Sequence, residues 1–591
     1  MEDLYGLFFK KSNTRSKGEY LQIYESYYVK GKGGRHRSIE ALGYVSDLIK
    51  NGIPDPISYG QNKVKEYNDK NKVDKEKQIG EVSLTKRVRH FLASNMFDYL
   101  GIDEYFNKLA INKKFHFDYA TFIRNMVYAQ ILQPGSKYQA FEKVIPSLYN
   151  GMEISYDQIL DATNYMGQNY ENYIEVINKT IDDKFGKRTL ETAFFDCTNY
   201  YFEIDAVFED KQKGPSKENR KDPIIGQALL LDENQIPIAM KMYPGNESEK
   251  PYIREIIKDM KERYDIDNKI VQAADKGLNC ARNIYAATVE SNDGYVFSKT
   301  FRGKGLSKKE KEWTLLEDNN KNIWSNYTDI SGNVLYKLKE CIDEFSYSFD
   351  DVDDNGKTKK IEFKIKEKRI VSYNPALARK QIREINKEVE KLRNKLTVKG
   401  ILKEELGDAS KYCNAEAFDK NGELVNISIA IDEEKIKESK AFAGYNLLVT
   451  SEVNKSKEDI YKIYHGLSRI EESFRFMKTY LEARPVFAHL KETIYGHFLI
   501  CYTAFTIMRL IELKLFKDQI PLTRIFEFMR SYNMTLTKEN AYINGATLND
   551  AVVTIKEVIG ARKLTNAFFS KKDLDLLFDL HLDEILCSTI N

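Results

Sequence analysis

Between residues 190 and 300 the sequence changes from helix-forming to strand-forming, and this stretch limits the possible folds more than any other. TAFFDCTNYYFE is a run of aromatic and β-branched residues typical of a strand, and IIGQALLLD and IPIAMKMYPG predict two more. A helix over Lys250–Tyr264, a short buried strand IVQAAD, a helix CARNIYAATVE and a fifth strand GYVFSKT follow. Three antiparallel strands, then helix, strand, helix and strand, predict a mixed α/β domain.

Two aspartates interrupt these apolar strands. Asp196 lies inside FFDCT, and Asp275 ends IVQAAD just before Gly277. A buried carboxylate without a partner costs several kcal/mol, so each must lie at an edge, pair with a cation or bind a metal. For a single strand aspartate a structural salt bridge or a cap is the more common explanation. Functional groups, however, gather at the carboxyl ends of strands in parallel α/β sheets.

A third acid, Glu471, lies on a helix predicted over Lys457–Tyr480, beside its apolar stripe. Alone it would be a residue of a solvated face. Three carboxylates from distant segments can hold two hard divalent cations, because Mg²⁺ or Mn²⁺ prefers oxygen ligands. Two such ions, about 3.5–4 Å apart, activate the attacking oxygen of a phosphodiester reaction and stabilise the leaving oxygen. The order of elements around these acids is that of an RNase H-like fold.

These motifs resemble those of a known family. FFDCTNYYFE and VQAADKG are similar to the segments that carry the first two acids of DDE transposases from insertion sequences. YHGLSRIEESFRFMK resembles the pattern Y-x2-R-x3-E-x6-K of the Tyr–Arg–Glu–Lys signature group, which belongs to the insertion sequence four superfamily. The residues that match this pattern are Tyr464, Glu471 and Lys478. Leu467 replaces the signature arginine, and either Arg469 or Arg475 could supply the cation instead.

The resemblance extends over roughly residues 15–515 and is greatest to the branch with long proteins. GPSKENRKD, YPGNESEK and LEARPVFAHLKETIYGHFLICY are also similar to segments of that branch. It implies an RNase H-like core interrupted by an insertion, with Asp196, Asp275 and Glu471 as catalytic residues that hold two Mg²⁺ or Mn²⁺ ions. The implied function is a DNA transposase that binds the element's terminal inverted repeats, cleaves the strands and joins them to target DNA, as a homodimer in the DNA complex.

Two other functions remain open. One is a transposase-derived DNA-binding protein that no longer cleaves, and the other is a host nuclease with the same core. The three intact acids argue against the first, since drift would be free to erase them. The helical 86–185 segment and the large insertion favour an element-specific protein over the second.

Several side chains near the motifs are candidate contacts to DNA, because arginine and lysine bind phosphates. They are Lys217, Arg220, Tyr464, Arg475, Lys478 and Arg484. Each cation could instead be an ordinary surface residue. Lys478 is favoured, since seven residues place it on the helix face of Glu471. Tyr464 shares that face, and its hydroxyl could bond a phosphate or its ring could belong to the core.

The only two tryptophans, Trp313 and Trp324, fall in the insertion. Related transposases can stack an insertion-domain aromatic on a base extruded at the transposon end, which is a sequence-tolerant contact. Ordinary packing is the alternative.

The patterns divide the chain into six regions. We expect an N-terminal β-rich unit and linker (1–85, with a hairpin around a Gly/Lys-rich turn), a helical DNA-binding domain (86–185), the first part of the core (186–300), a mixed β/α insertion (301–445), the second part of the core with the Glu471 helix (446–515) and a helical C-terminal region (516–591). Within the insertion we expect short strands and a long charged helix over Ala376–Leu396, which is solvated by default.

Composition is consistent with a nucleic-acid enzyme of the cell interior. There are 91 lysines and arginines against 89 acids, a balance that excludes a strongly basic coat-like protein but not basic faces. The six cysteines form no CxxC pair, which argues against disulfides or structural zinc and fits a reducing cytosol. The N-terminal apolar run is too short for a signal peptide, and no run reaches about 18 apolar residues. We therefore expect a cytoplasmic protein that does not bind membranes, and the family resemblance implies that it is bacterial and nucleoid-associated.

Overall fold

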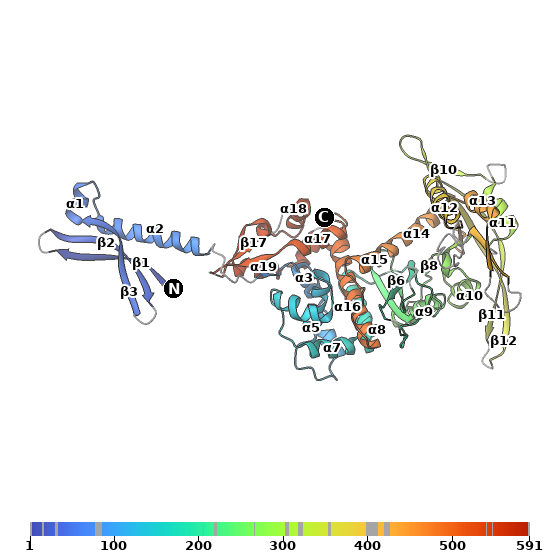
Figure 1. Cartoon of the computed structure of the whole chain (residues 1–591), viewed down its shortest axis with the longest axis horizontal. Helices are drawn as coiled ribbons and strands as arrows, with labels where there is room; N and C mark the ends of the chain where they lie inside the picture. The colour runs from blue at the N-terminus through green and yellow to red at the C-terminus, as the bar shows by residue number, and fades with distance from the viewer. Residues whose placement is uncertain are drawn as a thin grey trace. The chain divides into compact units, whose positions relative to one another are not determined.

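The computed structural model describes residues 3–14, 17–29, 33–76, 85–188, 190–204, 206–217, 221–264, 266–301, 306–316, 323–352, 356–396, 412–418, 426–538, 540–545 and 548–588. The chain forms two compact units (Figure 1). Unit 1 comprises Met1–Asn95, Ser147–Gly151 and Gln519–Asn591, and unit 2 comprises Met96–Pro146 and Met152–Asp518. The helical segment predicted over 86–185 is therefore shared between the two units.

Unit 2 is built on a large mixed sheet. Its central strands are β5 (Thr192–Tyr201), β6 (Ile224–Leu231), β7 (Pro237–Pro244), β8 (Val271–Ala274) and β9 (Gly294–Lys299). They lie in the order β7-β6-β5-β8-β9, with β6 antiparallel to both its neighbours and β8 parallel to both of its own. With α9 (Tyr252–Tyr264) and α10 (Ala281–Tyr285), this confirms the predicted order of elements between residues 190 and 300.

Helices cover both faces of these strands. On one face α9 and α10 pack against the odd-numbered residues of β5, among them Phe195 and Cys197. On the other lie α14 (Lys457–His465), α15 (Leu467–Thr479) and α16 (Lys491–Leu510). There the ring centroids of Tyr200 and Phe498 are 4.5 Å apart. Because successive strand residues point to opposite faces, Asp196 lies on the side of α15 and α16.

The helix predicted as one run over Lys457–Tyr480 is two helices that meet at Gly466. A Cβ atom at Gly466 would lie 2.5 Å from the ring of Phe194. The missing side chain therefore lets the junction of α14 and α15 lie directly on β5.

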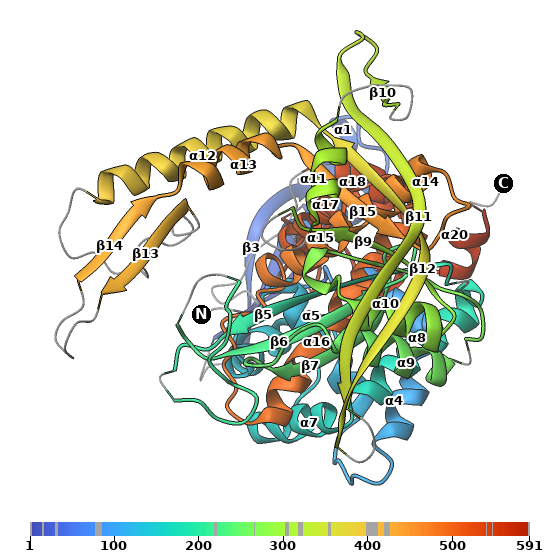
Figure 2. The ribbon, with the colours of Figure 1, turned by 90° about the vertical axis from the view of Figure 1, so that its right-hand side faces the viewer.

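Most strands of residues 301–445, the segment predicted as an insertion, extend the same sheet, whereas two strands near its end form a separate sheet. β15 (Tyr445–Thr450) pairs with β9, and β12 (Thr358–Tyr373), β11 (Val334–Val352) and β10 (Ser325–Thr328) follow in turn. The prediction of short strands here was wrong for β11 and β12, which have 19 and 16 residues and form the long hairpin of Figure 2. Their outer halves alternate exposed charged residues with half-buried ones, a pattern too polar to identify a long strand from sequence.

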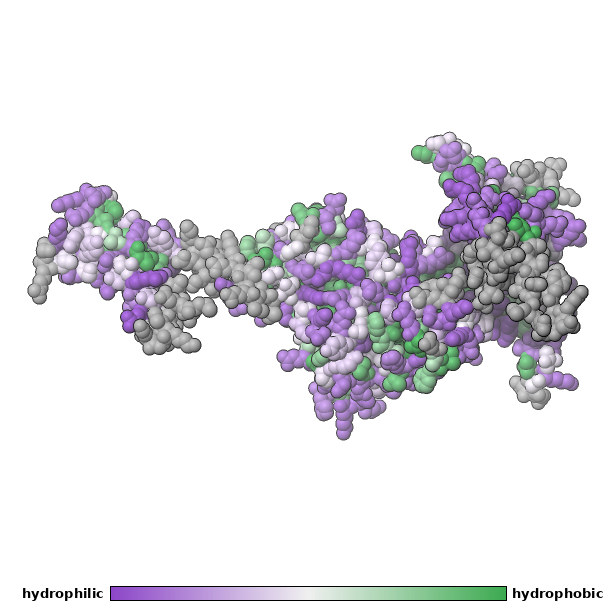
Figure 3. Space-filling view, viewed as in Figure 1, coloured by the Kyte–Doolittle hydropathy of each residue, from purple (hydrophilic) through white to green (hydrophobic). Residues whose placement is uncertain are grey.

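The rest of the insertion consists of α11 (Lys308–Leu315), α12 (Pro375–Leu396), β13 (Cys413–Phe418), β14 (Asn426–Ile431) and α13 (Glu433–Ala441). Helix α12, predicted over Ala376–Leu396, is not solvated all round. One side packs Leu392 with Tyr412 and with Ile436 of α13. Its outer surface is largely hydrophilic (Figure 3).

Both tryptophans pack inside the insertion. The Lys339 ammonium lies 5.2 Å from the ring centroid of Trp313 and 4.5 Å from that of Trp324. The indole of Trp324 also donates a hydrogen bond to the carbonyl of Leu316 (3.3 Å). Lys339 is buried, and the two indole rings provide much of its environment. This contact favours a packing role for the tryptophans over stacking on a base.

The helices before β5 are α3 (Phe91–Leu100), α4 (Asp103–Leu109), α5 (Tyr119–Leu132), α6 (Lys137–Gln139), α7 (Tyr156–Gln168) and α8 (Tyr170–Phe185). Within unit 2, α7 crosses the buried helix α16 at two glycines, Gly167 of α7 and Gly496 of α16. A Cβ at Gly167 would lie 1.7 Å from the carbonyl oxygen of Glu492, and one at Gly496 would lie 2.0 Å from that of Thr163. Of the helices described, none is both long and apolar enough to cross a membrane.

In unit 1, β1 (Asp3–Thr14), β2 (Gly18–Val29) and β3 (Gly33–Tyr44) form an antiparallel sheet, which confirms the predicted hairpin as β2–β3 and adds a third strand. Helix α2 (Pro56–Glu76) packs on it, and Asn68 hydrogen-bonds both backbone groups of Leu7 (2.9 Å each). The other elements are α1 (Val45–Lys50), β4 (Thr85–Lys86), α17 (Leu522–Ser531), β16 (Met534–Leu536), β17 (Tyr542–Asn544), α18 (Asp550–Val558), β18 (Phe568–Phe569), α19 (Lys571–Leu577) and α20 (Leu582–Ser588). The C-terminal region is thus not purely helical, because β16, β17 and β18 form one sheet with β4, in the order β18-β17-β16-β4.

Replacing Gly496 with alanine should destabilise the protein by about 1–3 kcal/mol, because the new methyl group forces α7 and α16 apart. Urea unfolding followed by circular dichroism measures the change. Gly34→Ala is the control, since a Cβ there meets nothing within 4 Å. A Gly496→Ala protein as stable as the control would contradict the close contact.

Candidate active site

Asp196 and Asp275 lie side by side. In the parallel pairing of β5 with β8, Phe195 is the partner of Ala274, and each aspartate is the next residue of its chain. Neighbouring strands are about 4.8 Å apart, and residues at equal levels point to the same face. The two carboxylates therefore share one side of the sheet, at the carboxyl end of β8.

Asp196 is largely buried, with 23% of its side chain exposed. Its Oδ1 atom accepts a hydrogen bond from the Cys197 amide (2.7 Å) and lies 3.7 Å from the ammonium of Lys217. Burial raises the pKa of Asp196 to about 6. Lys217 and the Cys197 amide oppose that rise, and the negative charges of Glu249 and Asp275 add to it.

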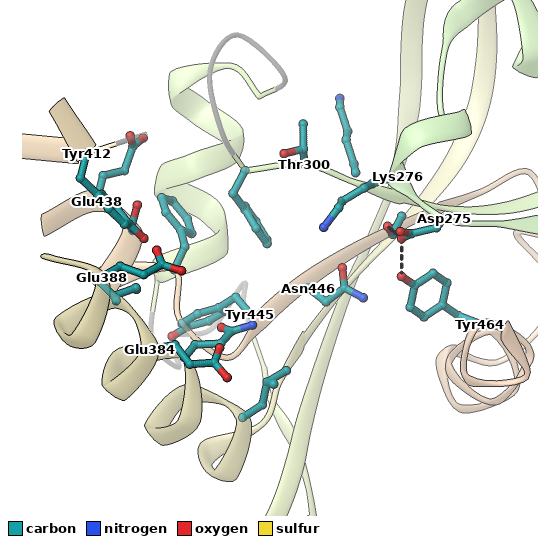
Figure 4. Close-up of a pocket in the computed structure, with 18 residues that line it drawn as sticks. Asp275, Lys276, Thr300, Glu384, Glu388, Tyr412, Glu438, Tyr445, Asn446 and Tyr464 are labelled. Carbon is teal, nitrogen blue, oxygen red and sulfur yellow. Dashed lines mark hydrogen bonds between the residues drawn. The ribbon is translucent and has the colours of Figure 1, made fainter. Parts of the chain in front are cut away.

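Asp275 is held by two hydroxyl groups. Ser298 of β9 donates to its Oδ1 atom (3.0 Å), and so does Tyr464 of α14 (3.1 Å; Figure 4). Burial, with the charge of Asp275, raises the pKa of Tyr464 to about 12, so this phenol remains a donor. In the described part of the chain, hydrogen bonds reach only the Oδ1 atom of each aspartate, which leaves each Oδ2 atom available to a cation.

Glu471 is exposed on α15, and the structure does not bring it to the two aspartates. No three His, Cys, Asp or Glu side chains of the described residues are placed to hold a metal ion together. Yet α15 runs along β5, since Gly466 lies at Phe194 and the Lys478 ammonium lies 5.2 Å from the ring centroid of Tyr200. Glu471 is five helical residues beyond Gly466, and Asp196 is two strand residues beyond Phe194. Each step advances about 7 Å along its element, so Glu471 and Asp196 lie at similar levels along β5.

The candidate DNA contacts differ in their surroundings. Lys478 lies over the ring of Tyr200 in β5. Arg484 lies over the ring of Tyr201, with its guanidinium carbon 5.5 Å from the ring centroid. Arg475 forms only a solvent-exposed pair with Glu472 (3.7 Å), and Arg220 lies outside the described residues. Leu467 is buried, which explains why an apolar residue is tolerated at the position of the signature arginine.

Lys217 is the candidate whose contacts differ most from those expected. Its ammonium lies 3.7 Å from Asp196 and 3.6 Å from Glu249, and it donates to the carbonyl of Cys197. Burial lowers the pKa of Lys217, but Asp196 and Glu249 outweigh this and raise it above its usual value. A cation thus already stands among the carboxylates, which is direct evidence that their oxygens can accept one.

Sequence reasoning missed Glu249 and Ser298. Glu249 lies within YPGNESEK, which resembled a family segment but had no assigned role. Ser298 carries no sequence signal, because a serine in a strand is commonplace and its partner Asp275 is 23 residues away.

A cavity of about 500 Å³ opens beside Asp275 and Tyr464 and extends to α12 (Figure 4). Glu384 and Glu388 line its far wall. Their carboxylates disfavour phosphate at the far wall, whereas Lys276 and Lys299 line the cavity nearer Asp275.

The sequence matches no protein-family model, and no curated protein is significantly similar to it.

In metal-free protein, Asp196→Asn should increase stability at neutral pH. The folded pKa of about 6 exceeds the unfolded value of 3.8, so wild-type stability falls as pH rises between about 4 and 6 and stays lower above that. The variant lacks this loss, and its advantage over wild type should grow by about 2 kcal/mol between pH 4 and pH 8.

Urea unfolding with a chelator present, at several pH values, measures this difference. Asp183→Asn, which removes an exposed aspartate of α8, is the control and should show no comparable gain. If the Asp196→Asn advantage did not change with pH, burial of the Asp196 charge would be wrong.

Proposed function

We propose that this chain is a DDE-type DNA transposase that cleaves the ends of an insertion sequence and joins them to target DNA. The observation that carries the proposal is the adjacent placement of Asp196 and Asp275 at one end of parallel strands. The strand order β7-β6-β5-β8-β9, in which β6 is antiparallel to β5 and β7 and β8 is parallel to β5 and β9, supports an RNase H-like core. The strands and helices between β9 and β15 form the insertion in that core.

Asp196 and Asp275 would hold the divalent ions, with Glu471 supplied from α15. Two such ions, when bound, activate the attacking oxygen and stabilise the leaving oxygen of a phosphodiester. Tyr464 and Ser298 fix the orientation of Asp275 through its Oδ1 atom. Lys478 and Arg484, along β5, are placed to bind the DNA backbone and align the scissile phosphate.

A second candidate is a transposase-derived DNA-binding protein without cleavage activity. The exposure of Glu471, away from the two aspartates, favours it. The retained pair of acids favours the active enzyme, because burial raises the pKa of Asp196 to about 6 and the ion pair with Lys217 only partly opposes that rise.

Cleavage should distinguish the two. With Mg²⁺ and supercoiled DNA that carries the sequences flanking the gene, wild type should nick at the element ends, whereas Asp196→Asn, Asp275→Asn and Glu471→Gln should each lose several orders of magnitude in rate. The losses should not add, because the three acids act as one unit.

Glu472→Gln is a matched control, since Glu472 is the exposed neighbour of Glu471 and pairs only with Arg475 at the surface. It should retain cleavage within a few-fold. Full activity in Asp196→Asn would exclude the DDE mechanism, and the absence of cleavage by wild type would favour the DNA-binding alternative.

Lys478→Ala should weaken DNA binding and reduce the slope of log affinity against log salt by about one, because one phosphate contact is lost. Fluorescence anisotropy with a duplex from the element end, at several salt concentrations, measures it. Lys258→Ala, at an exposed site on α9, should leave the slope unchanged. Equal slopes for wild type and Lys478→Ala would remove Lys478 from the DNA interface.

A further inference from the structure

Two segments without regular structure, GPSK at 214–217 and GNESEK at 245–250, come together beside Asp196. Their backbones touch: a Cβ at Gly214 would lie 1.9 Å from the carbonyl oxygen of Gly245. The Gly245 amide also donates to the carbonyl of Asp210 (3.0 Å). Side chains at these glycines would separate the two segments, so the glycines set the distance between Lys217 and Glu249.

Strand β5 fixes the first segment in place. Asn199 donates from its amide to the carbonyl of Pro215 (3.2 Å), and its Oδ1 atom accepts from the Lys217 amide (3.3 Å). Asn199 is three residues after Asp196 on the same strand. Lys217 is therefore held by its backbone next to the aspartate that its ammonium contacts.

Glu249 reaches across the site from the other segment. Its Oε2 atom lies 3.6 Å from the Lys217 ammonium, while its Oε1 atom is 3.4 Å from where a Cβ of Gly277 would be. Gly277 is two residues after Asp275. Glu249 thus lies between Lys217 and the turn after β8. It offers the Lys217 ammonium a second carboxylate at 3.6 Å, close to the 3.7 Å that separates the ammonium from Asp196.

An ammonium and a divalent ion cannot share Asp196 without penalty. At 4 Å, two unit charges interact by about 4 kcal/mol at an effective dielectric constant of 20, and a divalent ion doubles the repulsion. The lysine side chain has four rotatable carbons, so its ammonium can move while its backbone stays fixed. A cavity of about 530 Å³, lined by Lys217, Asn246, Ser248 and Glu249, lies on the Glu249 side and gives it room.

We propose that Lys217 occupies the cation position of Asp196 in the metal-free protein, and that the divalent ion displaces its ammonium onto Glu249. Lys217 is then a competitor of the metal, and Glu249 is a positioning residue that receives the displaced ammonium. This rests on the proposed function, because the metal concerned is the one that cleavage requires. A displaced Lys217 also faces the cavity, where a DNA phosphate would complete its neutralisation.

Mn²⁺ binding to the full chain without DNA tests the proposal, with free Mn²⁺ counted by electron paramagnetic resonance. Lys217→Met removes the competing charge and should tighten binding by about tenfold, a small part of the repulsion above, because in wild type the displaced ammonium escapes most of that repulsion. Lys217→Arg keeps the charge and should bind Mn²⁺ like wild type. Lys250→Met removes a lysine from the same turn that contacts neither aspartate, and should change the affinity much less.

Glu249 is tested by a double-mutant cycle. Glu249→Gln leaves Lys217 with Asp196 as its only carboxylate and should weaken Mn²⁺ binding by about tenfold. Most of that loss should vanish in the Lys217→Met background, because no displaced ammonium remains for Glu249 to bind. An equal loss in both backgrounds would make Glu249 a metal ligand instead and would overturn its role here.

Asp196→Asn separates this inference from the proposed function. If Asp196→Asn abolishes Mn²⁺ binding but Lys217→Met binds Mn²⁺ no more tightly than wild type, Lys217 does not compete with the metal, and the metal site itself stands. If no variant binds Mn²⁺, or if Asp196→Asn binds like wild type, the metal site itself is wrong and the competition with it. Circular dichroism of each variant establishes that it is folded.

Discussion

The parallel pairing of β5 with β8 is the constraint on which the rest of the site depends. Because Phe195 pairs with Ala274, the next residues of the two strands, Asp196 and Asp275, face the same side of the sheet at the same level. Adjacent carboxylates repel, and burial increases the cost of charge on Asp196. Other segments offset this cost: the loop before β6 brings Lys217, β9 brings Ser298 and α14 brings Tyr464. These donors reach the two acids from three different segments of the fold.

Glycines at two positions allow those donors to reach the acids. Gly466 lets the junction of α14 and α15 approach Phe194, next to Asp196 in β5, and Gly214 lets the Lys217 loop contact the backbone at Gly245. In both cases a methyl group would overlap atoms already present. The same device sets α16 against α7 at Gly167 and Gly496, farther from the acids. The geometry of the site is therefore determined by backbone contacts between segments, and its side chains are positioned by those contacts.

The sequence predicted the two aspartates because an acid inside an apolar strand is conspicuous, and it predicted the central strands because their periodicity is strong. It did not predict the pairing of Lys217 with Glu249, because the two residues are 32 positions apart in segments without regular structure and no local pattern relates them. Nor did it identify the β11–β12 hairpin, whose outer part is too charged to resemble a strand. The tryptophans show a third limit: nothing in the sequence relates them to Lys339, which in the fold is buried against both rings.

The exposure of Glu471 follows from the same electrostatics. In the metal-free chain one ammonium, that of Lys217, balances the charges of Asp196 and Glu249, and Asp275 relies on neutral hydroxyl donors. A third carboxylate brought to this point without further cations would raise the pKa of Asp196 beyond its present value of about 6. Divalent cations held by Asp196 and Asp275 would reverse that balance, since they would supply more positive charge than Lys217 and Glu471 could then serve as a further ligand. Approach of Glu471 and arrival of metal would then be one coupled event, which is consistent with a helix that already lies along β5 at the level of Asp196.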